Sequence, residues 1–171
     1  AATMQISELS HSAVIKGNGG VNVIHIQRDL RLSGNDALIL SGGINDVFIL
    51  NIDGGISTSG NASILIDGGL KSENILLNVI GDGRSGSSVR LSGNGRMHGT
   101  VLAVERDLMI SGNGRLVGSA FAERHLSISG NGFVLEQATF CVSAPAPAPT
   151  PAPTPAPDPA PAPAPTPAPV P

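Results

Sequence analysis

Short apolar stretches in which every second residue is aliphatic recur along the chain. Leu30 and Leu32 flank Arg31, and the same spacing returns in two later pairs, Leu108 with Ile110 and Leu126 with Ile128. Residues two apart in a strand point to the same face, so each pair predicts a short strand with one buried face. Longer aliphatic runs are brief and bounded by Gly, Asn or Asp, and no segment longer than about two turns has the 3.6-residue period of a helix. The pattern indicates an all-β protein.

A Ser-Gly-Asn triplet follows several of these pairs, at residues 92–94, 111–113 and 129–131. Gly reaches positive φ freely, and Asn tolerates the left-handed region, so each triplet is typical of a turn. The steps from one of these triplets to the next are nearly equal. A strand and corner repeated at a fixed period predict a single β-solenoid, in which each repeat forms one coil.

Stacked coils would place equivalent residues above one another, about 4.8 Å apart. We therefore expect a structural corner ladder of Ser92, Asn94, Ser111, Asn113, Ser129 and Asn131. We also expect a core ladder of Leu91, Leu108, Ile110, Leu126 and Ile128. Residues 1–143 are long enough for about seven such coils around one hydrophobic core.

Composition divides the chain sharply. All 14 prolines lie at alternate positions from Pro145 to Pro171, mostly paired with Ala. This alternation favours an extended polyproline II conformation. The sequence therefore predicts two domains, a β-solenoid at 1–143 and an Ala/Pro/Thr-rich tail at 144–171. The tail fits either a stiff solvated spacer or an ordered strut along a neighbouring subunit, and its threonines are candidate O-glycosylation sites.

Charge and cysteine content limit the partners and the compartment. The net charge is −3, and the chain has no Trp or Tyr, which disfavours nucleic acid. No apolar run reaches a membrane-spanning length. Cys141 is the single cysteine, so an internal disulfide is impossible. The chain starts at Ala1, as expected of a product whose signal peptide has been removed, and we expect it to be secreted.

Three motifs suggest chemistry, but each is better explained structurally. The segment Gly81–Gly86 has the spacing of a dinucleotide fingerprint, yet another strand rather than a helix follows it, so we interpret it as a loop. The four histidines show no ligand spacing. The Asp-Gly pairs lack the nonapeptide repeat of calcium β-rolls and are typical of turns. We expect no metal, no cofactor, no catalytic residue and no enzymatic activity.

The order of several segments resembles a known family. Residues 45–54, 67–79, 98–103 and 118–124 resemble the choice-of-anchor A family of bacterial surface proteins. This resemblance covers roughly residues 4–140. It implies an exported β-rich domain followed by a linker and a sorting or anchoring signal.

Residues 47–140 are also similar to the ice-binding β-solenoid family, sharing the Val-Phe-Ile strand, the Gly-Gly and Asn-Ile corner and the Leu-Ala coil. That family carries a long helix along its solenoid, for which residues 1–46 have no pattern. It binds ice through one flat face, and the outward arginines Arg90, Arg96 and Arg115 fit an ice plane poorly.

The ends of a solenoid expose unpaired strand edges, which recruit other strands unless they are covered. We therefore predict a non-enzymatic extracellular structural protein that stacks head to tail on copies of itself into filaments or a surface matrix, braced by its tail. The assembly candidates are Val21, Val23, Ile24, Ile26, Phe133, Phe140, Pro145 and Pro171. The alternatives are an ice-binding solenoid and a cell-surface adhesive module on a Pro-rich spacer.

Overall fold

The computed structural model describes residues 3–80 and 88–135. The chain divides after Phe140, and all of the described residues belong to the first of its two units. The expected loop Gly81–Gly86, together with Phe140, Cys141 and the whole Pro-rich tail, lies outside the described residues. The expectations for these parts, including the boundary at 143/144, stay predictions.

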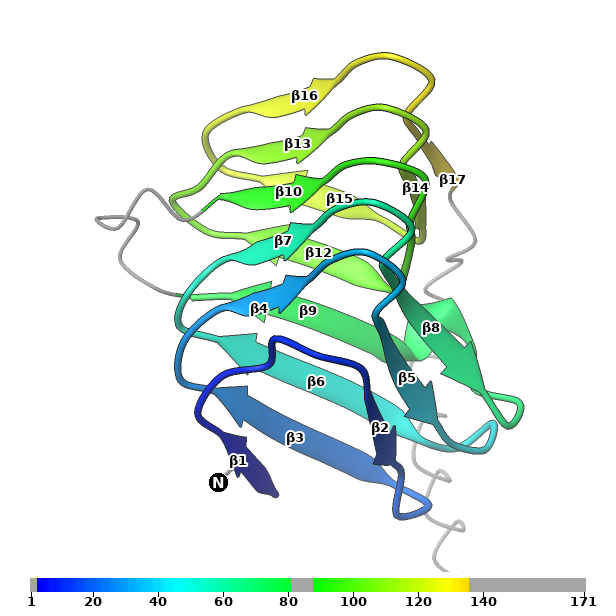
Figure 1. Cartoon of the computed structure of the whole chain (residues 1–171). Helices are drawn as coiled ribbons and strands as arrows, with labels where there is room; N and C mark the ends of the chain where they lie inside the picture. The colour runs from blue at the N-terminus through cyan, green and yellow to red at the C-terminus, as the bar shows by residue number, and fades with distance from the viewer. Residues whose placement is uncertain (1–2, 81–87, 136–171) are drawn as a thin grey trace, which may run out of the picture. The chain divides into compact units, whose positions relative to one another are not determined.

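Three parallel sheets wind around one core (Figure 1). Sheet A contains β1 (Met4–Ile6), β3 (Val21–Ile26), β6 (Val47–Ile52), β9 (Ile75–Val79), β12 (Thr100–Ala103) and β15 (Ala120–Ala122). Sheet B contains β4 (Leu30–Leu32), β7 (Ile56–Thr58), β10 (Val89–Leu91), β13 (Leu108–Ile110) and β16 (Leu126–Ile128). Sheet C contains β2 (Ala13–Lys16), β5 (Ala37–Ser41), β8 (Ser63–Asp67), β11 (Arg96–His98), β14 (Arg115–Val117) and β17 (Phe133–Leu135).

Each turn of the chain adds one strand to sheets A, B and C in that order, which is the winding of a β-solenoid. The first coil is an exception, because Leu9 forms an isolated bridge to Leu30 where a strand of sheet B would stand. A 3-10 helix at Ser72–Asn74 is the one helical segment within the described residues. The prediction of an all-β solenoid is confirmed.

The coils differ in length. In sheet A, Ile24 pairs with Leu50, Leu50 with Leu77, Leu77 with Val101, and Val101 with Ala120. The step along the chain is longest from Leu50 to Leu77 and shortest from Val101 to Ala120. The short period read from the Ser-Gly-Asn triplets therefore holds for the later coils alone. Because the earlier coils are longer, the described residues form six coils rather than about seven.

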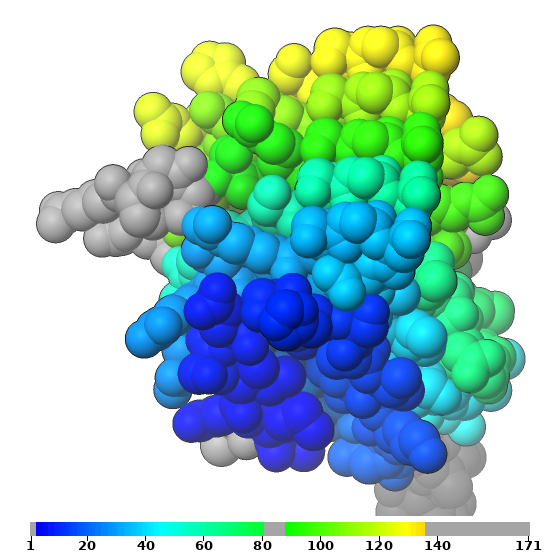
Figure 2. Space-filling model, viewed as in Figure 1, coloured from blue at the N-terminus to red at the C-terminus, as the bar shows by residue number. Residues whose placement is uncertain are grey.

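The core consists of the inward side chains of all three sheets. Leu38, Leu50 and Ile64 are fully buried, although they come from different strands of sheets A and C. The expected core ladder lies in sheet B, where β10, β13 and β16 pair in register. Figure 2 shows the coils as consecutive bands in contact with one another. Stacking on both sides is therefore what buries each inward residue.

The assembly candidates in residues 21–26 lie in the second coil, next to the first strand of sheet A. These residues form β3, which pairs with β1 on one side and with β6 on the other. Ile24 and Ile26 are buried in the core as a result. The short strand β1 pairs with the second half of β3, from Ile24 to Ile26, whereas Val21 is 58% exposed.

Candidate functional surfaces

The Ser-Gly-Asn triplets form the corner between sheets B and C, which we call the asparagine corner. The Nδ2 of Asn131 donates to Oδ1 of Asn113 at 3.1 Å, and the Nδ2 of Asn113 donates to Oδ1 of Asn94 at 2.7 Å. The three predicted asparagines thus lie one above another in successive coils. The serines are stacked beside them, and the Ser92 hydroxyl donates to the Thr58 carbonyl at 2.8 Å. Ser111 and Ser129 follow β13 and β16 in the same register.

The ladder is longer than the sequence analysis indicated. Asn94 donates to Asn61 at 3.1 Å, and Asn61 donates to Asn35 at 3.0 Å, so five amides are hydrogen-bonded in one row. The signal was present in the sequence, because Ser-Gly-Asn also occurs at residues 33–35 and 59–61. These two copies were not assigned to the ladder, and each lies much farther from the next copy than the later triplets lie from one another.

The glycine of each triplet is required by the close approach of the coils. Gly93 has φ of +82°, and a Cβ there would clash with the carbonyl oxygen of Gly60 in the coil before it. The backbones of successive corners are therefore in direct contact and hydrogen-bonded to one another. For example, the N–H of Asn94 donates to the carbonyl of Gly60 at 2.7 Å.

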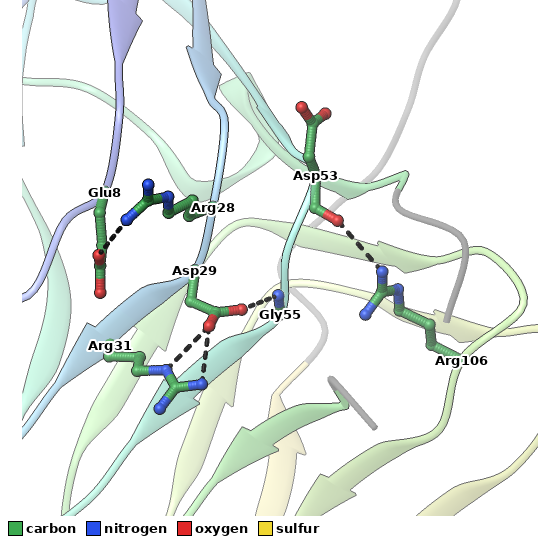
Figure 3. A network of polar contacts seen from close by, with 7 residues as sticks. All are labelled: Glu8, Arg28, Asp29, Arg31, Asp53, Gly55 and Arg106. Atoms are coloured by element: carbon green, nitrogen blue, oxygen red, sulfur yellow. Dashed lines mark hydrogen bonds and ion pairs between the residues drawn. The ribbon is translucent and has the colours of Figure 1, made fainter. Parts of the chain in front are cut away.

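Charged residues gather at the corner between sheets A and B (Figure 3). The Asp29 carboxylate accepts hydrogen bonds from the Arg31 guanidinium at 2.7 and 3.0 Å and from the Gly55 N–H at 2.7 Å. Arg28 lies 3.8 Å from Glu8 in the first coil. These contacts link the first three coils, so the charges here have structural partners.

Arg106 differs from the other arginines because its side chain is 2% exposed. Its guanidinium donates to the Asp53 carbonyl at 3.2 Å, although the two residues are two coils apart (Figure 3). The Asp53 carboxylate lies 2.9 Å from His25 Nε2. Arg106 stands two residues before an apolar pair, as the exposed residues Arg28 and Arg124 do, so nothing in the local sequence indicated its burial.

A buried carboxylate accepts several hydrogen bonds at the corner between sheets C and A. Asp46 is 4% exposed and accepts hydrogen bonds from the N–H groups of Gly43 and Gly19, each at 2.8 Å, and from Asn22 Nδ2 at 3.1 Å. The Gly43 hydrogen bond is the main cause of the lowered pKa of Asp46; burial opposes the shift, and the contacts of Asn22 and Gly19 add to it. The carboxylate therefore joins two successive corners as an anion.

Ser72 and His98 form a contact that resembles part of a catalytic arrangement. The Ser72 hydroxyl lies 2.9 Å from His98 Nδ1, beside a hollow lined by Ile66, Leu70 and neighbouring residues. Burial lowers the pKa of His98, and the nearby charge of Arg96 lowers it further. The charged group that acts on the histidine is therefore the Arg96 cation, not the carboxylate of a catalytic triad. Ser72 itself is only 5% exposed, so its hydroxyl is shielded from a substrate. We interpret the pair as a buried structural contact.

The outward faces of the three sheets differ in charge. Sheet B carries Arg31 and Arg90, and sheet C carries Lys16, Asp67, Arg96 and Arg115. The described strands of sheet A contain no Lys, Arg, Asp or Glu. The outward side chains of sheet A include a half-buried aliphatic row of Val23, Ile49 and Leu76. Sheet A is therefore the face whose described strands carry no Lys, Arg, Asp or Glu, although the carboxylate of Asp53, just after β6, contacts His25 of β3.

The last described coil exposes its apolar side chains. Leu126 and Ile128 are 48% and 46% exposed, whereas Leu108 and Ile110, in the same rows one coil earlier, are 1% exposed. Within the described residues, nothing pairs with the outer edges of β15, β16 and β17. Phe133, an assembly candidate, lies in β17, where its ring centroid is 5.1 Å from the Arg115 guanidinium.

Two kinds of site have no counterpart in residues 3–80 and 88–135. No three His, Cys, Asp or Glu side chains gather there in a way that could hold a metal ion. The same residues contain no helix with the length and hydropathy needed to cross a membrane.

Three parallel sheets, a ladder of stacked amides at one corner and an uncharged outer face define the chain as a three-sided parallel β-solenoid. The profile of the family described as Ice-binding-like matches residues 3–134. The chain belongs to the Ice-binding-like family.

A solved structure supports the fold. The chain is similar to an ice binding protein from an Antarctic bacterium, Flavobacteriaceae, with a TM-score of 0.68 and 24% sequence identity. The match covers 84% of this chain and 32% of that protein, so the chain spans about a third of the length of the protein it resembles. The comparison with curated protein sequences found no match.

These findings favour one of the two resemblances noted in the sequence. The similarity to the ice-binding family is confirmed and begins at residue 3, earlier than residue 47 as the sequence indicated. The resemblance to the choice-of-anchor A family stays a prediction. For function, the comparisons favour the ice-binding alternative over the self-assembling filament.

Proposed function

We propose that this chain binds ice through the outward face of sheet A. The main support is the charge pattern of sheet A. The chain is a solenoid of the Ice-binding-like family, and the described strands of this sheet contain no Lys, Arg, Asp or Glu. Charged side chains orient water radially around themselves and would interrupt an ordered layer. The described strands of sheet A contain no such charge, and the contact of Asp53 with His25 lies where β6 ends.

The geometry of sheet A supports the proposal. Val23, Ile49 and Leu76 pair in register across three coils, and on the same face Asn78 Nδ2 donates to Asn51 Oδ1 at 2.8 Å. Outward groups in such a sheet repeat about every 4.8 Å between strands and about every 6.6 Å along a strand. Water beside apolar groups is restricted in orientation. A regular apolar array therefore favours a regular water layer.

One coil offers a matched set of variants for testing the face. Ile49, Ser57 and Leu65 lie in the third coil and point outward from sheets A, B and C. Each would be replaced by Tyr, which suits a strand and adds the same bulk to each face. We expect Ile49→Tyr to abolish most thermal hysteresis, while Ser57→Tyr and Leu65→Tyr keep it.

Circular dichroism would check that all three variants are folded. A wild-type chain without thermal hysteresis or inhibition of ice recrystallisation would overturn the ice-binding proposal. Activity lost in Leu65→Tyr but kept in Ile49→Tyr would instead reject sheet A as the face. Because the ice that a cell meets forms first in the surrounding water, we propose an extracellular location, which fractionation of expressing cells would test.

Head-to-tail stacking is a second candidate, favoured by the half-exposed Leu126 and Ile128. The column of sheet A ends in Ala120 and Ala122, and it begins with the larger Met4 and Ile6 in the equivalent rows. The first coil of one copy could thus place large side chains over small ones in the last coil of another. The Pro-rich tail could brace such a stack.

Sedimentation at increasing protein concentration would test stacking. We expect assemblies in the wild type and fewer in Leu126→Lys, with Ser127→Lys as a control that points outward from the same strand. Purely monomeric wild type at high concentration would count against this candidate. Removal of residues 144–171 would test the bracing role separately, since stacking through the coil ends does not need the tail.

A further inference from the structure

The asparagine corner is flanked by three arginines that belong to no described ion pair. Arg90 points outward from sheet B, and Arg96 and Arg115 point outward from sheet C. All three side chains are exposed. The three segments around this corner, residues 89–98, 108–117 and 126–135, contain no Asp or Glu. In these three coils the corner is therefore locally cationic, on a chain whose net charge is −3.

The placement of two of these arginines carries an electrostatic cost. Arg96 and Arg115 are paired in register on adjacent parallel strands, so their backbones are about 4.8 Å apart. Like charges placed directly opposite each other in a sheet destabilise it. Arg115 gains a contact with the Phe133 ring, but this contact does not neutralise the charge. A bound anion would relieve the repulsion.

The ladder adds a row of polar groups beside the charges. Each Asn side chain has two N–H donors, and the ladder uses one of them to reach the coil below. The exposed side chains of Asn94, Asn113 and Asn131 therefore each keep an N–H for a ligand. These donors repeat at the coil spacing of about 4.8 Å. A ligand that uses them would be linear and would run along the solenoid axis.

We propose that the asparagine corner binds a linear acidic polysaccharide that carries carboxylate groups. Arg96 and Arg115 would bind successive carboxylates, since guanidinium and carboxylate groups form paired hydrogen bonds. The Asn amides would bind the sugar hydroxyls. Nucleic acid fits this corner less well, because no Trp or Tyr is available to stack on bases. This site lies on different sheets from the proposed ice-binding face and does not depend on it.

The binding test uses calorimetry with oligomers of polygalacturonate and, as a neutral control, the methyl-esterified oligomers. We expect wild type to bind the acidic oligomers, with an affinity that falls as salt is raised. The double variant Arg96→Gln/Arg115→Gln should lose at least about tenfold in affinity, which is the size of one strong charged contact. The matched control is Arg28→Gln/Arg124→Gln, which removes the same charge at the corner between sheets A and B.

Three outcomes would overturn the proposal. They are no binding by wild type, equal losses in both double variants, and single-stranded DNA binding as tightly as the acidic oligomers. A second readout needs no ligand. At low salt, Arg96→Gln alone should raise the melting temperature by relieving repulsion, and the gain should disappear at about 1 M salt, where charges are screened within about 3 Å. A gain that salt leaves unchanged would contradict the electrostatic argument.

Discussion

The substitution Thr58→Val is expected to make the protein more stable. Thr58 is fully buried in sheet B, and its hydroxyl oxygen has no hydrogen-bond partner among the described residues. Leu32 and Leu91 occupy the same inward row in the neighbouring coils. A buried hydroxyl without a partner costs about 1–3 kcal/mol in lost hydration. Valine has nearly the same shape without this polar group.

We expect a gain of about 1 kcal/mol, the lower part of that range. The gain arises because the unfolded variant lacks a hydroxyl that water would hydrate, whereas the folded variant loses no hydrogen bond. For a folded unit of this size, the gain corresponds to a rise in melting temperature of roughly 3–4 °C. Thermal unfolding followed by circular dichroism would measure it, and urea unfolding should show a higher midpoint with an unchanged slope.

Two variants separate this effect from its alternatives. Ser57→Val removes the hydroxyl of the neighbouring outward residue, so it reports the effect of losing a solvated hydroxyl from the same strand, which we expect to stay within about 0.5 kcal/mol. Thr58→Ser keeps the hydroxyl and removes a buried methyl, so it should cost about 1 kcal/mol. If Thr58→Val is no more stable than wild type, the reasoning is refuted, and a buried water bound to the hydroxyl becomes the explanation.

Three further predictions concern the core and the corners. Leu50→Ala should cost about 2–5 kcal/mol in urea unfolding, whereas Leu126→Ala, at the half-exposed end, should cost less than half as much; equal costs would show that the end is covered. Gly93→Ala should lower the melting temperature more than Gly19→Ala, because both have positive φ but only the former adds a backbone clash; similar losses would argue against close coil contact. The lowered pKa of Asp46 means that its carboxylate stabilises the fold above the usual value of 3.8, and that this contribution is lost as pH falls through the folded pKa. The difference in melting temperature between wild type and Asp46→Asn should therefore shrink on acidification, and a constant difference would contradict the shift.

The later coils could be predicted from the sequence better than the earlier ones. Residues 89–132 repeat an apolar pair followed by Ser-Gly-Asn-Gly at a nearly constant step, so strand, corner and inward rows could all be assigned from alternation and from this corner. The second and third coils contain the same corner but are longer, and a search for one period passes over them. Successive coils must keep the same spacing between their strands, but they need not have the same number of residues. Extra residues can therefore lie in the corners while the strands stay paired in register.

The polar sites were harder to predict because their partners are distant in the chain. The hydrogen bonds of Asp46 reach back 27 residues to Gly19, and Arg106 reaches 53 residues back to Asp53. Nothing local distinguishes these residues from exposed ones of the same type. The charge difference between the faces, by contrast, can be read from the strands once each is assigned to its sheet. The uncharged character of sheet A was missed because that assignment requires the register.

The pairing of β10 has a practical consequence for engineering. Nine residues of the sequence separate β9 from β10, whereas three separate β6 from β7 in the coil before. Even so, Val89, Arg90 and Leu91 pair in register with β7 on one side and with β13 on the other. The winding thus accepts added residues at this position without a shift in its neighbours. A foreign peptide grafted at this position would be displayed on a scaffold whose stacking order stays intact.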